Sequence, residues 1–218
     1  MKSLPFAAAF AVLAALACDG RSSVRTAEAS IADANASRAR QDSIVRARPG
    51  YVIDSILPVE EEIRRFQATL DRHPDGFTNG APSRSALVRQ FVRAIEANDT
   101  TALARLVVDR AEFGYLVYPT SPNAAPPYRQ SPSLVWLTRS AGTAKGADRL
   151  LARYGGRQIG YVGYSCHGAA ERRGENTIWA QCAVRLTTAG RETSSLRLFG
   201  PIVERGGRFK FLSLTNGL

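Results

Sequence analysis

The sequence is poor in the side chains that bind metals and cofactors. It contains two histidines and three cysteines in 218 residues. A zinc site usually takes its four ligands from two closely spaced pairs, and His167 next to Cys166 has no such second pair in the sequence. Glycine-rich phosphate loops and nucleophile motifs are also missing. We therefore expect no metal and no cofactor.

Lysine is also rare, although the chain is strongly basic. The net charge is +10, and of the 29 basic residues only three, Lys2, Lys145 and Lys210, are lysines. The arginines are spread along the chain without a basic run longer than two residues. Because nucleic-acid-binding proteins gather positive charge into a patch or stripe, we expect no nucleic acid as a partner. The charge indicates a solvated basic surface or, in an exported protein, contact with anionic lipids or cell-envelope polymers.

The hydrophobic stretch at the N-terminus is too short to span a membrane. Residues 4–17 are uncharged and rich in Ala, Leu and Phe, whereas a helix that crosses a bilayer needs about 20 apolar residues. The stretch follows a positively charged start at Met1 and Lys2, which is typical of a signal peptide. We interpret residues 1–17 as a signal peptide that is removed on export.

The residues before Cys18 decide how the exported product is held. Residues 14–18 read Ala-Ala-Leu-Ala-Cys and resemble a bacterial lipoprotein signal, although Leu16 lies one position closer to the cysteine than usual. That resemblance implies acylation of Cys18 and a firm membrane tether in the bacterial cell envelope, facing the periplasm. Residues 15–17 equally fit an ordinary small-x-small cleavage site, which would release a soluble secreted protein.

The two remaining cysteines indicate an oxidising compartment. A hairpin folded symmetrically about Gly174 pairs positions whose numbers sum to 348, so Cys166 faces Cys182. Opposite residues in antiparallel strands have Cα atoms about 4.5–5.5 Å apart, within the range of a disulfide. A bridge would close a loop of about 17 residues and stabilise the fold by roughly 3 kcal/mol. Two buried free thiols facing each other are the alternative.

Composition divides the rest of the chain into three parts. Residues 18–50 carry the lipidated cysteine and then mostly Ala, Ser, Arg, Asp and Gln, so we expect a disordered, flexible tether with transient helix at residues 27–39. Residues 51–82 form a helical lead-in. Residues 83–218 form the main folded domain.

Apolar spacing and capping residues predict helices first and strands afterwards. Ser83 or Ser85 is placed to cap one helix and Asp99 the next. The predicted helices cover residues 58–70, 83–98, 99–107, 133–137 and 147–154. The predicted strands cover residues 113–118, 158–166, 177–187, 194–203 and 208–215, with a proline-rich loop at residues 120–132 and a tight turn at residues 204–207. The expected fold class is α+β, with helices packed in a curved antiparallel sheet.

This order resembles the nuclear-transport-factor-2-like fold, also called ketosteroid-isomerase-like or polyketide-cyclase-like. The resemblance is carried by residues 87–108, particularly 91–95 and 98–103, and by residues 202–212 around the Gly-Gly turn. It implies a cone-shaped sheet that encloses a pocket. Members of this family serve as enzymes, carriers and scaffolds, so the fold does not assign a function.

Catalytic groups are few in the expected domain. Glu112 and His167 are the weak candidates for an acid or base, because the predicted strands from residue 158 onward hold no carboxylate in their interiors. Aromatic residues are better placed to line a pocket, although core packing explains them equally well. They are Tyr115, Tyr118, Tyr128, Trp136, Tyr161 and Tyr164.

Two functions follow from these observations. We expect an exported, membrane-tethered lipoprotein whose non-catalytic domain binds a small apolar ligand or an envelope protein. The alternative is an isomerase or lyase that uses His167 with Tyr115 or Tyr118. A homodimer through the sheet face that carries Trp179 and Arg185 is a further possibility for this fold.

Overall fold

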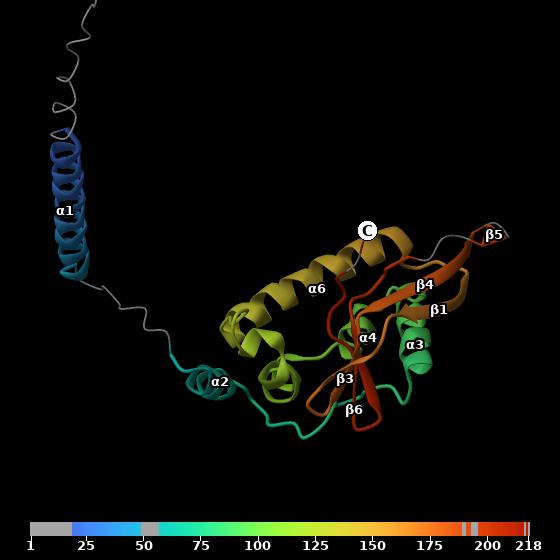
Figure 1. Ribbon diagram of the computed structural model, residues 1–218. Coiled ribbons are helices and arrows are strands. Elements are labelled where there is room, and N and C mark those ends of the chain that lie inside the picture. Colours follow the sequence, from blue (N-terminus) through green and yellow to red (C-terminus); the bar gives the residue numbers. More distant parts are fainter. Residues whose placement is uncertain (1–18, 49–56, 189–190, 193–195, 216, 218) are drawn as a thin grey trace, which may run out of the picture. The chain divides into compact units, whose positions relative to one another are not determined.

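A computed structural model of the chain describes residues 19–48, 57–188, 191–192, 196–215 and 217. It divides into two compact units, residues 1–56 and residues 57–218 (Figure 1). The expected signal peptide and Cys18 lie outside the described residues. Within the described part of the chain, no helix is long and apolar enough to cross a membrane.

The described residues of the first unit contain one helix, α1, over Asp19–Arg46. The expectation of a disordered tether at residues 18–50 is therefore corrected, because residues 19–46 are helical. Alanine, arginine, glutamate and glutamine favour helix, which gives this segment a local helical preference. From Ser30 to Arg48 its described side chains are exposed, except for a partly covered Val45.

The second unit begins with the helices that the sequence predicts. α2 spans Val59–Gln67, α3 spans Arg84–Glu96 and α4 spans Thr100–Arg105. Ser83 and Asp99 cap α3 and α4 by accepting hydrogen bonds from the backbone N–H groups of Ala86 and Ala102. These caps satisfy backbone donors that a helix cannot satisfy itself, so they fix where each helix starts.

The predicted strand over residues 113–118 is wrong, because this segment is helical. A three-residue turn, α5 (Arg110–Glu112), leads into a π-helical segment, η1 (Phe113–Val117), and two short 3-10 turns follow, η2 (Tyr118–Thr120) and η3 (Pro122–Ala124). A capping box starts the helix, since Asp109 accepts from the N–H of Glu112 and Glu112 accepts from the N–H of Asp109.

The two helical stretches predicted after the proline-rich loop are one helix. α6 runs without a break over Pro132–Tyr154, with Ser131 as its cap and Gly155 at its end. Gly146 lies where α6 crosses the C-terminal segment, and a Cβ at this position would come within 2.0 Å of the carbonyl oxygen of Leu214. Glycine therefore permits this close crossing rather than ending the helix.

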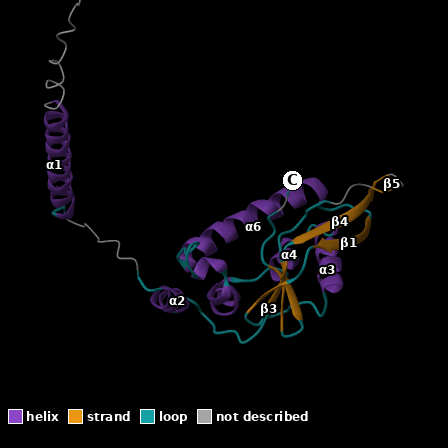
Figure 2. Ribbon diagram, in the orientation of Figure 1, coloured by secondary structure: helices purple, strands orange, loops and turns teal. Residues whose placement is uncertain are grey.

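The strands form two small antiparallel sheets instead of the single curved sheet that we expected (Figure 2). The first has the order β1-β4-β5, and the second has the order β2-β3-β6-β7. Their bounds are β1 Tyr161–His167, β2 Glu171–Arg173, β3 Asn176–Trp179, β4 Gln181–Thr188, β5 Arg191–Glu192, β6 Ile202–Arg205 and β7 Arg208–Phe211.

The hairpin that carries the cysteines is divided between these sheets. Its base pairs β1 with β4 and sets Cys166 opposite Cys182, as predicted, and a disulfide joins them. Its tip pairs Arg173 with Asn176, a register shifted by one residue, so that β3 leaves β4 at Ala180 and joins β6. A one-residue slip turns side chains to the other face of a sheet. Cys182 and Ile178 are accordingly buried in different hydrophobic clusters.

The second sheet is covered on both faces, by a first cluster that includes Cys182 and by a second cluster that includes Ile178. Successive residues of a strand point to opposite faces. On β6, Ile202 lies in the first cluster, with residues of α3 and α4, and Val203 lies in the second, with residues of α2, η1 and α6. Phe211 and Leu212 divide in the same way.

The end of the chain agrees with the prediction in part. The turn between β6 and β7 uses Gly206 and Gly207, both with positive φ, which suits a two-residue hairpin. β7 ends at Phe211 rather than at Thr215. Of the strand predicted from residue 194, residues 194 and 195 lie outside the described residues. Leu196 forms one isolated bridge with Val184.

Candidate functional site

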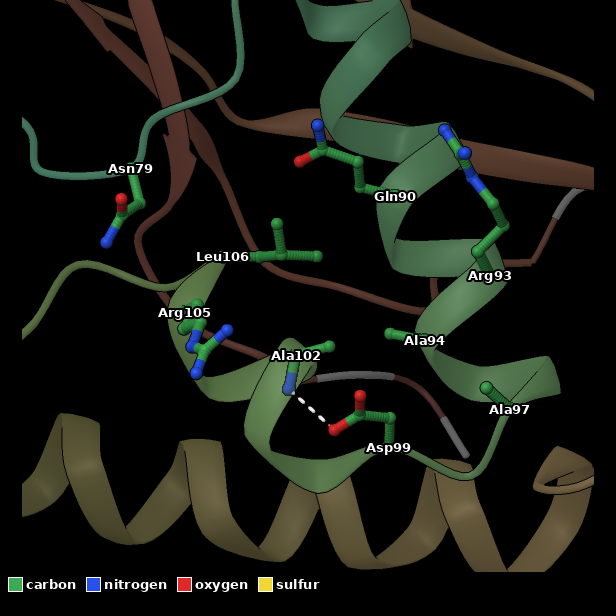
Figure 3. Close-up of a pocket in the computed structure, with 9 residues that line it drawn as sticks. All are labelled: Asn79, Gln90, Arg93, Ala94, Ala97, Asp99, Ala102, Arg105 and Leu106. Atoms are coloured by element: carbon green, nitrogen blue, oxygen red, sulfur yellow. Dashed lines mark hydrogen bonds between the residues drawn. The ribbon is translucent and has the colours of Figure 1, made fainter.

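A groove of about 480 Å3 lies between the C-terminal half of α3 and α4 (Figure 3). Asn98, with a φ of 53°, turns the chain between the two helices, and Asp99 starts α4 directly afterwards. The short connection keeps the two helices adjacent. The lining residues are Asn79, Gln90, Arg93, Ala94, Ala97, Asp99, Ala102, Arg105 and Leu106.

The groove combines an apolar floor with a polar rim. Alanines on both helices leave the space, and buried Leu106 lies beneath it. Arg93 and Arg105 come from different helices, with Gln90 and Asn79 near them in Figure 3. This composition is typical of a binding site, where apolar surface supplies affinity and a few polar groups fix orientation.

Few of the described residues that line this groove could act as an acid or a base. Asp99 is the one carboxylate there, and its Oδ1 accepts from the N–H of Ala102 at 2.8 Å as the cap of α4. No histidine lines the described groove.

Glu112, a weak catalytic candidate, lies in a buried ion pair with Lys210. Glu112 is 0% exposed and Lys210 is 3% exposed. The Lys210 ammonium lies 2.8 Å and 3.0 Å from the two carboxylate oxygens and also donates to the carbonyl of Val107. The carboxylate accepts two further bonds from the N–H groups of Thr78 and Asp109. Both charged groups are therefore already bonded to partners inside the protein.

His167, the other weak candidate, is exposed at the end of β1. Its Nε2 lies 3.4 Å from the hydroxyl of Ser165. Tyr115 instead stacks on His73, with ring centroids 3.9 Å apart. Within the described part of the chain, no contact joins His167 to Tyr115 or Tyr118.

The aromatic residues predicted to line a pocket do not line any one of the described cavities together. Tyr118 is fully buried, and its hydroxyl donates to the carbonyl of Gln130 at 2.5 Å and to that of Asn123 at 3.3 Å. Burial raises the pKa of Tyr118, with a smaller contribution from the charge of Glu62. Trp136 packs on Phe113, with ring centroids 5.4 Å apart.

The other tyrosines lie elsewhere. Tyr128 is 68% exposed. Tyr161 and Tyr164 lie on β1 against the first cluster, and the hydroxyl of Tyr164 is 3.5 Å from that of Ser85. Burial, and then Tyr164, raise the pKa of Tyr161. Tyr161 also borders a smaller cavity beside Arg89 and Glu96.

The face proposed for dimerisation is partly covered within the chain itself. The guanidinium of Arg84 lies 4.5 Å from the centre of the Trp179 ring, and Phe209 packs beside that ring with centroids 6.0 Å apart. A homodimer through Trp179 and Arg185 stays a prediction. In the described residues, no group of three His, Cys, Asp or Glu side chains is arranged to hold a metal.

No family model matches the sequence, and no curated protein or solved structure is significantly similar to it.

Proposed function

We propose that this chain is an exported lipoprotein whose second unit is a non-catalytic binding module for a small apolar molecule. The observation that carries the proposal is the α3–α4 groove, with its floor of alanines and Leu106 and its rim of two arginines. The Cys166–Cys182 disulfide supports a location outside the cytoplasm, because such bridges persist in oxidising compartments. The membrane tether rests on the sequence around Cys18.

A relation to the nuclear-transport-factor-2-like fold belongs to the same proposal. Capped α3 followed by capped α4, and the final β6–β7 hairpin with its Gly-Gly turn, are the elements that support it. In this proposal the ligand lies between α3 and α4 rather than inside a cone lined by tyrosines.

Acylation of Cys18 is the first prediction. Mass spectrometry of the chain expressed in a bacterium should find an N-terminus at Cys18 that carries diacylglycerol and a third acyl chain or a free amine. Several buried acyl chains hold a protein firmly on a membrane, so the protein should sediment with membranes. Cys18→Ala should move it to the soluble fraction. An unmodified cysteine after cleavage at Ala17 would contradict the tether.

Binding in the α3–α4 groove is the second prediction. The fluorescence of N-phenyl-1-naphthylamine rises in apolar surroundings, so titration with this probe reports occupancy. Ala97→Phe places a ring in the groove and should weaken binding at least about tenfold, since the lost apolar contact is worth more than 1.4 kcal/mol. Ala152→Phe is the matched control, because Ala152 is exposed on α6 away from the groove.

The control should bind the probe as the unchanged protein does. Equal binding by Ala97→Phe and the unchanged protein would remove the groove from the proposal. An equal loss of probe binding in Ala97→Phe and Ala152→Phe would point to a general effect of an added surface ring.

A further inference from the structure

A second cavity, of about 390 Å3, lies between the first half of α6 and the β2–β3 hairpin. Two arginines line it, Arg139 from α6 and Arg173 from β2. Buried Val135, Ile178 and Leu212 line it as well. The cavity therefore combines positive charge with an apolar wall.

Arg139 carries a charge that the described chain does not neutralise. An arginine has five N–H donors. The structure gives this one a single hydrogen bond, from Nη1 to the carbonyl of Leu212 at 3.4 Å, and a position 5.3 Å from the centre of the Phe113 ring. No carboxylate in the described residues forms an ion pair with it. Burial, and then the charge of Arg173, lower the pKa of Arg139 from its ordinary value.

A partly buried and unpaired cation costs stability unless something compensates it. Most arginines in the described part of the chain avoid that cost by being exposed to water or by pairing with an acid. Arg139 is only partly exposed and forms no such pair, and it lines an open cavity. An anion bound there would supply the missing partner.

Arg173 shows what kind of anion fits. Its guanidinium is already held by Glu171 through two hydrogen bonds of 2.6 Å. The hydrogen bonds from Arg173 lower the pKa of Glu171, so this carboxylate is ionised and stays beside the cavity. The two arginines and one glutamate leave a net charge of about +1. That charge suits a monoanion and disfavours a doubly charged phosphate.

From these contacts we infer that the cavity between α6 and β2–β3 binds a small monocarboxylate with an apolar body. The carboxylate pairs with Arg139, and the apolar body lies against Val135, Ile178 and Leu212. Thr138 and Ser213 lie at the same cavity and add hydroxyl groups for hydrogen bonding. The site is separate from the α3–α4 groove, with which it shares no lining residue.

The test is isothermal titration of the full exported chain with benzoate. Benzoate should bind, whereas benzamide, its neutral isostere, and inorganic phosphate should bind at least tenfold more weakly. Arg139→Met should weaken benzoate at least tenfold while leaving the ligand-free protein as stable or more stable, because an unpaired charge leaves a partly apolar site. Arg172 lies next to Arg173 on β2 but is absent from the cavity lining, so the Arg172→Met variant should bind benzoate normally.

Two further variants sharpen the result. Glu171→Gln frees Arg173 and should allow phosphate to bind, since the net charge at the cavity then rises by one. Ala97→Phe, which blocks the other groove, should leave benzoate binding unchanged, so this inference and the proposed function fail or succeed separately. The inference is overturned if benzoate does not bind, if benzamide binds equally well, or if Arg139→Met binds benzoate as tightly as the unchanged protein.

Discussion

Replacing Lys210 by methionine should lower the free energy of unfolding by about 3–5 kcal/mol, which is a large part of the stability of an ordinary domain. The ammonium of Lys210 is the one cation that contacts the buried carboxylate of Glu112 among the described residues. Methionine keeps most of the length of the side chain and removes its charge. The substitution therefore leaves an uncompensated carboxylate inside the protein.

The reason for the size of this effect is where the pair lies. Lys210 belongs to β7, and Glu112 is the last residue of α5, directly before the η1 segment that carries much of the second cluster. Their contact ties the C-terminal hairpin to a segment about one hundred residues earlier. Urea unfolding followed by tryptophan fluorescence measures the loss, since Trp179 packs against the first cluster and Trp136 against the second.

A matched control and a double substitution separate this mechanism from a general effect. Lys145→Met makes the same chemical change at an exposed position and should alter stability by less than about 0.5 kcal/mol. Lys210→Met combined with Glu112→Gln leaves no buried charge and should cost about 1–3 kcal/mol, from imperfectly paired hydrogen-bonding groups. If the two single effects simply add in the double variant, the pair does not stabilise the fold as we describe.

Local signals in the sequence were sufficient for much of the secondary structure. Ser83 and Asp99 each accept a hydrogen bond from the backbone N–H three residues ahead, so their caps depend on no distant partner. The Gly206-Gly207 turn is local in the same sense. The pairing of Cys166 with Cys182 was predicted from a hairpin centred on Gly174, and it holds at the base although the tip pairs one residue out of that register.

The errors arose where two interpretations of one local pattern competed. Residues 113–118 are a continuous apolar run, which periodicity does not assign to strand or helix. The capping box at Asp109 and Glu112 was visible in the sequence and favours helix, and this signal was missed. The split of the hairpin at Ala180 depends on β3 finding β6, a contact that no local pattern specifies.

The described cavities were not predicted at all. The α3–α4 groove exists because alanines of two helices face one another, and small residues leave space only after the helices are packed. Arg139 and Arg173 are far apart in sequence and look like any of the other arginines. What distinguishes Arg139 is partial burial without a carboxylate partner in the described residues, which is a tertiary property. Charge pairing, rather than residue type, identified that site.

Removing the Cys166–Cys182 disulfide is expected to lower the free energy of unfolding by roughly 3 kcal/mol, as for a closed loop of this length. β1 depends strongly on this bridge. Its side chains are only partly buried or exposed, so it is held mainly by pairing with β4. Cys166→Ala with Cys182→Ala should therefore loosen β1 before the rest of the unit, and hydrogen exchange should find its amides losing protection first.

The comparison of oxidised and reduced protein decides whether the bridge has this role. Dithiothreitol should lower the urea midpoint of the unchanged chain and leave the double alanine variant unaffected. Cys18→Ala should respond to dithiothreitol as the unchanged chain does, because Cys18 takes no part in the pair. If reduction leaves both the midpoint and the protection of β1 unchanged, the hairpin is stable without its bridge. The disulfide would then report an oxidising compartment without contributing to the stability of the fold in it.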